Sequence, residues 1–259
     1  MLSFARVFVV STCFLISVAG CGRGADNTLS NNYYEPYTIS HVKDPLDHEG
    51  ASLLVISLDS PEILTKLAKY KRLKQLRLED MNLSAADISD MKPLPMLDLL
   101  SLRRCSGLTA DVGKVFASKV IAREVWVCAG GRGPDSDPGS EFLATYLQAV
   151  DVGRIEYIGD PGNLTWLASI QERPSVHKLD VSHVALYQVD IAHMVTLSGM
   201  KKLNLNHCDL SGVRSFAPLL SLKNLTELDL SYSTGAKADL LDEIEEFRKA
   251  RPEVTIWGP

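Results

Sequence analysis

The sequence predicts an α/β solenoid in which parallel strands line one side and helices line the other. Three observations favour this fold. A strand-like motif recurs along most of the chain, its copies start at a nearly constant interval, and helix-like stretches separate them. With 259 residues, 46% of them hydrophobic and 23% charged, the chain has the composition of a globular protein. Its net charge of −5 gives no support to nucleic-acid binding, which favours a basic surface.

The first twenty residues have the pattern of an export signal. Arg6 provides a positive charge, residues 7–18 are almost wholly apolar, and residues 19–20 are small. Twelve helical residues span about 18 Å, which is short for a hydrocarbon core of about 30 Å. The pattern predicts a secretory signal peptide over residues 1–20, and the alternative is a buried helix at the start of the domain.

The end of this segment is more specific. Residues 18–21 read "VAGC", an aliphatic residue and two small residues before a cysteine. This resembles the lipobox of bacterial lipoproteins. The resemblance implies cleavage before Cys21, a diacylglycerol on its thiol and acylation of the new amino group. Because Gly22 stands where Asp retains some lipoproteins at the inner membrane, it also implies the outer membrane or cell surface. Two or more acyl chains, at about 0.8 kcal/mol per buried methylene, form a stable anchor.

Residues 21–48 are predicted to be the lipidated cysteine and a flexible tether. The segment is rich in Gly, Asn, Ser and Pro and has little apolar periodicity. A flexible chain of this length has a typical end-to-end distance of about 25–30 Å. The domain proper is predicted over residues 49–259, and residues 33–45 are the candidate cover for its N-terminal end.

The recurring motif has apolar residues at positions one, four, six and nine and a leucine at position eleven. Because positions four and six alternate with polar residues, this part of each copy is predicted to be a strand with one buried face, as with Leu76 and Leu78. Successive starts are 22 to 30 residues apart, and an insertion at residues 130–140 explains the longest interval. The copies start at Ala51, Leu73, Leu97, Ala122, Val152, Val176, Met200, Leu225 and, as a half-copy, Arg251.

The motif resembles the leucine-rich repeat family over residues 51–259. The resemblance implies a horseshoe-shaped solenoid of about eight to nine turns, with the strands on the concave face and the helices on the convex face. Stacked turns bury a core that no single turn can bury alone. Ser84 and Ser211 are predicted N-caps of two helical stretches. Residues 238–250 form an amphipathic pattern for a closing helix, which a strand at residues 254–256 follows.

Positions three, five, seven and eight of each copy are predicted to face the concave surface, where equal positions form ladders about 4.8 Å apart. In the later copies, acidic or amide groups at position five lie beside basic groups at position three. One interpretation is charge balance on a solvated face, and the other is a polar docking strip. The candidate partner-binding residues are Arg103, Arg104, Trp126, Glu156, Asp180, His183, Asn204, His207, Asp229 and Tyr232.

Enzymatic chemistry has little support in the sequence. His183 and His207 occupy equal positions in adjacent turns, but a metal site would need a further ligand, such as Asp180 or Asp209. The loop with Asp135 and Asp137 lacks the spacing of a calcium loop. We find no nucleophile elbow, phosphate loop or dinucleotide motif, and we expect neither a cofactor, a metal nor a catalytic residue.

The cysteines of the repeat domain are not predicted to form a disulfide framework. Cys105 and Cys208 both fall on the inward position nine but lie four turns, about 20 Å, apart. Cys128 is one turn from Cys105 but faces the other way.

By family analogy we expect an exported, membrane-anchored protein that binds a protein or glycan partner through its concave face. The alternatives are a structural component of the cell envelope that packs through its convex helices and, last, a metal-dependent enzyme. No nucleic-acid partner is expected.

Overall fold

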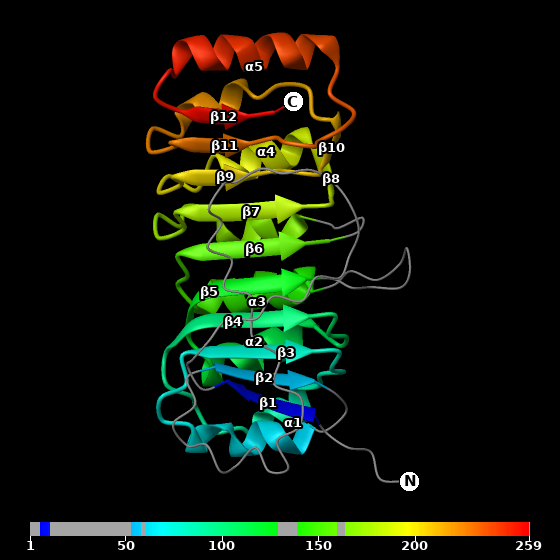
Figure 1. The fold of residues 1–259 in the computed structure, drawn as a ribbon, viewed down its shortest axis with the longest axis vertical. Helices are drawn as coiled ribbons and strands as arrows, with labels where there is room; N and C mark the ends of the chain where they lie inside the picture. The colour runs from blue at the N-terminus through cyan, green and yellow to red at the C-terminus, as the bar shows by residue number, and fades with distance from the viewer. Residues whose placement is uncertain (1–5, 11–52, 58–60, 129–138, 160–163, 259) are drawn as a thin grey trace.

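A computed structural model of the whole chain describes residues 6–10, 53–57, 61–128, 139–159 and 164–258. One sheet forms a ladder along the long axis of the molecule, and the helices lie behind it (Figure 1). The sheet follows the order β1-β2-β3-β4-β5-β6-β7-β9-β11-β12. From β2 to β12 all neighbouring strands are parallel, one strand to a turn, while β1 is antiparallel to β2. The predicted α/β solenoid is therefore confirmed.

The elements alternate between strand and helix along most of the chain. The strands of the main sheet are β1 (Arg6–Val10), β2 (Leu53–Ser57), β3 (Gln75–Glu79), β4 (Leu97–Arg103), β5 (Ala122–Cys128), β6 (Arg154–Ile158), β7 (Lys178–Ser182), β9 (Lys202–Asn204), β11 (Glu227–Asp229) and β12 (Thr255–Trp257). The α-helices are α1 (Ala85–Ser89), α2 (Ala110–Lys119), α3 (Ser140–Ala149), α4 (Gln188–Met194) and α5 (Ala238–Ala250). The 3₁₀ helices are η2 (Pro61–Lys69), η3 (Thr165–Ile170) and η4 (Ala217–Ser221), and a separate two-stranded sheet joins β8 (Ala185–Tyr187) to β10 (Asp209–Gly212).

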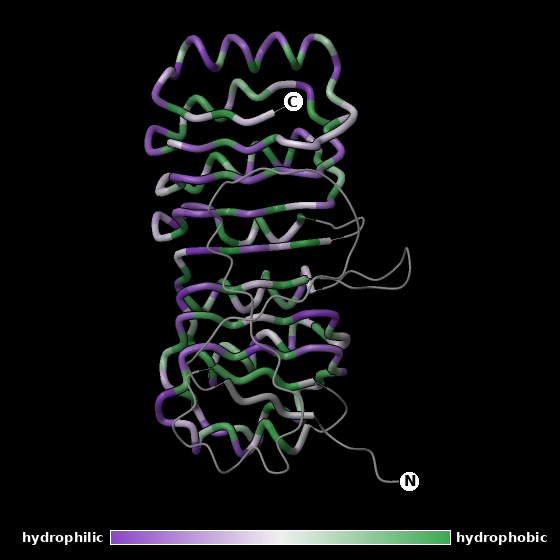
Figure 2. Tube along the Cα trace, in the orientation of Figure 1, coloured by the Kyte–Doolittle hydropathy of each residue, from purple (hydrophilic) through white to green (hydrophobic). Residues whose placement is uncertain are grey.

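The core lies between the sheet and the helices. Positions four and six of the motif point into it, so Leu76, Leu78, Leu179 and Val181 are fully buried as predicted. Figure 2 shows the resulting alternation of hydrophobic and hydrophilic residues along the strands. Each fully buried leucine contributes about 1.5–3 kcal/mol, which explains how turns that are unstable alone form one body.

The ladders at positions three and five are confirmed from β2 to β11. In β12, however, Thr255 pairs with Glu227 and Trp257 pairs with Asp229. Counted from the start at Arg251, positions three and five of the last half-copy were predicted to be Glu253 and Thr255, so this register was wrong by two residues. The reason is local. The long helix α5 ends at Ala250, and the chain then turns, with Val254 donating a hydrogen bond to the Arg251 carbonyl, before the strand begins.

One of the two predicted N-caps is confirmed. Ser84 caps α1 in a capping box, in which Ser84 Oγ accepts from the Asp87 amide and the Asp87 carboxylate accepts from the Ser84 amide. Ser211 is not a cap, because it lies within β10 and donates its amide to Asp209 Oδ1 at 2.9 Å. The helix of that turn, η4, starts only at Ala217.

The C-terminal end of the stack is closed by α5, as predicted (Figure 1). Leu240, Ile244 and Phe247 are buried, whereas Leu241 remains 40% exposed. Arg251 strengthens the closure, because its guanidinium donates to carbonyl oxygens of the preceding turn, at Leu220, Leu222, Lys223 and Leu225.

The predicted export signal overlaps the described residues only at β1, which extends the sheet beside β2 in the full chain. Cys21, the tether at residues 21–48 and most of the insertion lie outside the described residues, so the predicted signal peptide, lipid anchor and domain boundaries stay predictions. In the described part of the chain, no helix has both the length and the apolar character needed to span a membrane.

Candidate functional site

The sheet face, by which we mean the side of the main sheet turned away from the helices, carries most of the candidate residues. Position five forms one continuous row along it, because the strands are in register. From β3 to β11 the row reads Arg77, Ser101, Trp126, Glu156, Asp180, Asn204 and Asp229. The row therefore begins with hydrogen-bond donors and ends with carboxylates and an amide.

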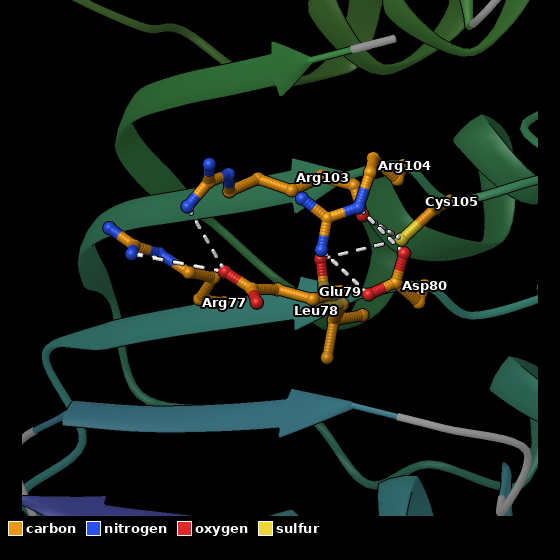
Figure 3. A network of polar contacts seen from close by, with 7 residues as sticks. All are labelled: Arg77, Leu78, Glu79, Asp80, Arg103, Arg104 and Cys105. Carbon is orange, nitrogen blue, oxygen red and sulfur yellow. Dashed lines mark hydrogen bonds and ion pairs between the residues drawn. The ribbon is translucent and has the colours of Figure 1, made fainter. Parts of the chain in front are cut away.

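At the donor end lies an arginine cluster, formed by Arg77, Glu79, Asp80, Arg103 and Arg104 (Figure 3). The guanidinium groups of Arg77 and Arg103 both reach Glu79 Oε1, at 3.9 Å and 3.3 Å. Burial, followed by repulsion from Arg103, lowers the pKa of Arg77. Two cations therefore share a single carboxylate oxygen.

Arg104 has a different environment from Arg103, although the sequence grouped the two. Its Nε and Nη2 donate to both carboxylate oxygens of Asp80, each at 2.7 Å, in a forked ion pair (Figure 3). This hydrogen bonding raises the pKa of Arg104. Arg104 thus links two turns through their equal positions, while it remains 43% exposed at the side chain.

The middle of the sheet face holds Trp126 and Arg154. The Arg154 guanidinium lies 5.0 Å from the centre of the Trp126 ring, within the range of a cation–π contact. It also forms ion pairs with Glu124 at 3.4 Å and with Glu156 at 3.0 Å. Trp126 is therefore held in place by an arginine of the next strand.

Two of the three carboxylates of the row are buried. Glu156 is 9% exposed and Asp180 is 7% exposed, so the interpretation of this face as solvated is wrong for these two residues, although Glu156 is charge-balanced by Arg154. Burial, and then the neighbouring Asp180, raises the pKa of Glu156, while Arg154 and Lys178 oppose this shift. Burial is also the main cause that raises the pKa of Asp180, against Lys178 and a hydrogen bond with Asn204. The predicted basic partners at position three are thus present but do not outweigh desolvation.

At the carboxyl ends of β7, β9 and β11 stands a ring column of His183, His207 and Tyr232. The two imidazoles are 4.9 Å apart with planes at 7°, and Tyr232 stacks on His207 at 4.9 Å and 10°. All three residues are exposed, with Tyr232 at 75%. The three rings form an ordered aromatic strip that solvent reaches.

Backbone geometry builds both the column and the forked pair. Asp80, Arg104, His183, His207 and Tyr232 all occupy position eight, and all have left-handed φ angles between 50° and 60°. In two of these turns the position-five side chain stabilises the bend, because Asn204 Oδ1 accepts from the Asn206 amide and Asp229 Oδ1 accepts from the Ser231 amide. A non-glycine residue in this region is uncommon.

The ring column does not have the geometry of a metal site. Its imidazoles lie in nearly parallel planes, so their nitrogens do not converge on one point. Across the described ranges, no three His, Cys, Asp or Glu side chains come together in a metal-binding group.

The three cysteines of the described chain are free. The thiols of Cys105 and Cys208 donate to the carbonyls of Leu78 and Val181, each at 3.4 Å. Burial raises the pKa of Cys105 to about 11 and that of Cys208 to about 12, which makes both thiols poor nucleophiles at neutral pH.

Comparison with known proteins gives limited information. No family model matches the sequence, and no curated protein matches it. A similar solved structure is that of an internalin from Listeria monocytogenes, at 14% identity over 76% of this chain and 70% of that chain, with a TM-score of 0.35. The fold assignment therefore rests on the strand order and register of this chain.

Sequence reasoning missed two features of the site. It did not select Arg77 or Ser101, although both occupy position five, and it did not foresee that Arg104 pairs with Asp80. The available signal was the interval of 24 residues between Asp80 and Arg104, which puts opposite charges at equal positions of adjacent turns.

Proposed function

We propose that this chain is an exported lipoprotein, anchored through Cys21, that binds a protein partner through its sheet face and ring column. The lipobox supports export and anchoring, and it is a sequence argument alone. The ring column carries the binding proposal, because three exposed, mutually aligned rings form a rigid aromatic surface of the kind enriched at interface hot spots.

The charges beside the column favour a protein over a neutral glycan. Asp180 and Asp229 lie in the same turns as His183 and Tyr232, and the pKa of Asp180 is raised by burial, so a basic group from a partner would stabilise its charged form. Aromatic rings next to carboxylates suit Lys and Arg side chains, which bind both. We therefore expect the partner to present a basic segment to the C-terminal half of the sheet face.

Site-specific photocrosslinking in cells tests this function. A photoreactive residue at Tyr232 should give a discrete adduct, whereas one at Tyr187 should not. Tyr187 is a matched control because it is an exposed tyrosine, 58% accessible, that lies outside the main sheet. His207→Ala should then weaken the Tyr232 adduct. An adduct at Tyr187 alone would contradict binding through the sheet face.

The same experiment addresses a structural role in the envelope. Val189, Leu220 and Leu241 are exposed apolar residues on α4, η4 and α5. Crosslinks from these positions, without crosslinks from Tyr232, would favour packing through the helices.

The lipid anchor has its own test, which is mass spectrometry of the mature N-terminus. We expect a peptide that starts at an acylated Cys21, and a Cys21→Ser variant should leave the membrane fraction. An unmodified N-terminus at Met1 would contradict the anchor without affecting the binding proposal.

A further inference from the structure

Three hydrogen-bond donors in the arginine cluster and beside it have no partner. They are Arg77 Nε, Ser101 Oγ and Trp126 Nε1, all buried atoms. The residues are direct neighbours across β3, β4 and β5, so their Cα atoms span about 10 Å. Arg77 is 5% exposed and Ser101 is 0% exposed. Native proteins rarely leave such groups without an acceptor, so this row calls for an explanation.

The charges of the cluster also indicate that it can accept an anion. Both carboxylate oxygens of Asp80 accept hydrogen bonds from Arg104 in the forked pair. Arg77 and Arg103 both contact Glu79 instead (Figure 3). Two guanidinium groups and one carboxylate leave an excess of one positive charge. Glu156 also acts on the buried Arg77 but is itself paired with Arg154 at 3.0 Å, so Glu79 is the carboxylate that Arg77 and Arg103 both contact.

Packing does not require a charge at this position. On β2, the residue in register with Arg77 is Val55, which is buried at 8% exposure. An apolar side chain therefore fits the same row one strand away. A purely structural role would be met by such a residue, whereas a long cation with an unused Nε is suited to binding an acceptor.

We infer that Arg77, Ser101, Arg103 and Trp126 bind a carboxylate side chain from an acidic segment of the partner protein, which rests on the proposed function in assuming that a protein contacts the sheet face. Arg103 is the point of entry, because its side chain is 41% exposed and its present contact with Glu79 is a single 3.3 Å bond. An incoming carboxylate pairs with Arg103, while Glu79 stays with Arg77 Nη1 and Arg77 Nε remains available to the carboxylate. Trp126 and Ser101 supply the neighbouring neutral donors.

A carboxylate suits the cluster better than a phosphate does. Arg77 and Arg103 share the single carboxylate of Glu79, and two further carboxylates, Asp80 and Glu156, stand close by. These carboxylates would repel a dianion more strongly than a monoanion. Together with the acidic end of the position-five row, the cluster gives the sheet face a polarity that matches a partner segment with acidic residues at one end and basic residues at the other.

Fluorescence polarisation with the purified full chain tests the inference. The probe is a labelled peptide with the sequence Gly-Ser-Glu-Gly-Glu-Ser-Gly, and the matched probe replaces both Glu by Gln. We expect the Glu peptide to bind at least tenfold more tightly than the Gln peptide. Arg103→Gln and Arg77→Leu should each weaken the binding of the Glu peptide at least tenfold, and Trp126→Phe, which removes only Nε1, should weaken it about threefold.

Arg214→Gln is the control, because Arg214 is an exposed arginine that lies between β10 and η4, outside the main sheet. Its binding should equal that of the wild type. Thermal unfolding should show that Arg77→Leu folds, and Arg103→Gln gives a second measurement at an exposed residue. Equal affinity for the Glu and Gln peptides, or unchanged binding by both variants, would overturn the inference.

Competition with acetate and inorganic phosphate decides the chemistry of the anion. Acetate should displace the Glu peptide at lower concentration than phosphate does, and the reverse order would overturn the assignment of a carboxylate. Failure of the peptide to bind, with the Tyr232 crosslink intact, removes this inference alone. Loss of the crosslink, with the peptide still bound, removes the proposed function alone.

Discussion

The two ends of the sheet face are built from the same positions of the same repeat, yet they are chemically opposite. At position five, β3 and β4 carry Arg77 and Ser101, while β6 and β7 carry Glu156 and Asp180. At position eight, the first end has the forked pair of Asp80 and Arg104, and the second has the ring column. The backbone is shared, so the difference lies in side chains alone.

This comparison teaches that the inward and outward positions of the repeat follow different constraints. Inward positions four and six are apolar in both regions and determine the fold. Outward positions have no such constraint, and here they hold buried charges that cost stability, a cation at one end and carboxylates at the other. Under the proposed function, a partner pairs with these charges, which the fold does not need.

The largest expected effect shows that the two regions share one core. Leu100→Ala beneath the arginine cluster and Leu179→Ala beneath the acidic end should each lower the free energy of unfolding by about 2–5 kcal/mol, because both side chains are fully buried. Urea denaturation measures this loss. A loss at one site that exceeds the other several-fold would break the equivalence of the two regions.

A smaller effect should separate the regions by their pH dependence. Burial raises the pKa of Asp180, so the folded state binds this proton more readily than the unfolded state does. Stability from this group is fully present below the unfolded pKa of about 3.9 and is lost as the pH rises through the folded pKa. Asp180→Asn should therefore be more stable than the wild type at pH 7, by about 1 kcal/mol, and equally stable near pH 4.

Urea denaturation at several pH values tests this, with Asp242→Asn on α5 as an exposed control that should change little. Arg77→Leu should also be at least as stable as the wild type, but without a change between pH 4 and 7, because an arginine keeps its charge throughout. If the wild type became more stable relative to Asp180→Asn as the pH rose from 4 to 7, the pKa of Asp180 would be lowered in the folded state and not raised.

These features differ in how far the sequence predicted them. The strands and their register followed from the spacing of residues such as Leu76 and Leu78, because burial on one face enforces a strict alternation. The register of β12 was missed because α5, with 13 residues, is longer than the helices of the earlier turns.

The pairing of side chains on the sheet face was predicted less well than their positions. The ladders placed His183, His207 and Tyr232 at equal positions, but ring stacking depends on their left-handed backbone. That Arg77 and Arg103 share Glu79 depends on rotamers, which no spacing encodes.

A third prediction concerns how the ring column is held. His207→Ala should cost about 0.5–1.5 kcal/mol, because it removes a ring that stacks on both neighbours. His207→Gly removes the same ring but also relieves a left-handed residue, whose cost is about 1–2 kcal/mol for a non-glycine residue. The glycine variant should therefore be the more stable of the two in thermal unfolding. If the glycine variant were the less stable of the two, the left-handed backbone at φ 54° would not be a source of strain at His207.

The smallest expected effect contrasts the two kinds of contact at position eight. Arg104→Gln should cost no more than about 1 kcal/mol at low salt, because the forked pair with Asp80 is half exposed. This cost should vanish in 1 M salt, where the Debye length falls to about 3 Å. Tyr232→Ala should cost about 0.5 kcal/mol at either ionic strength, because stacking on His207 does not depend on charge. If salt changed the cost of the Tyr232 variant, or left the cost of the Arg104 variant unchanged, the two contacts would not differ in kind. The forked pair at one end of the solenoid would then not be distinguished from the ring column at the other by its dependence on charge.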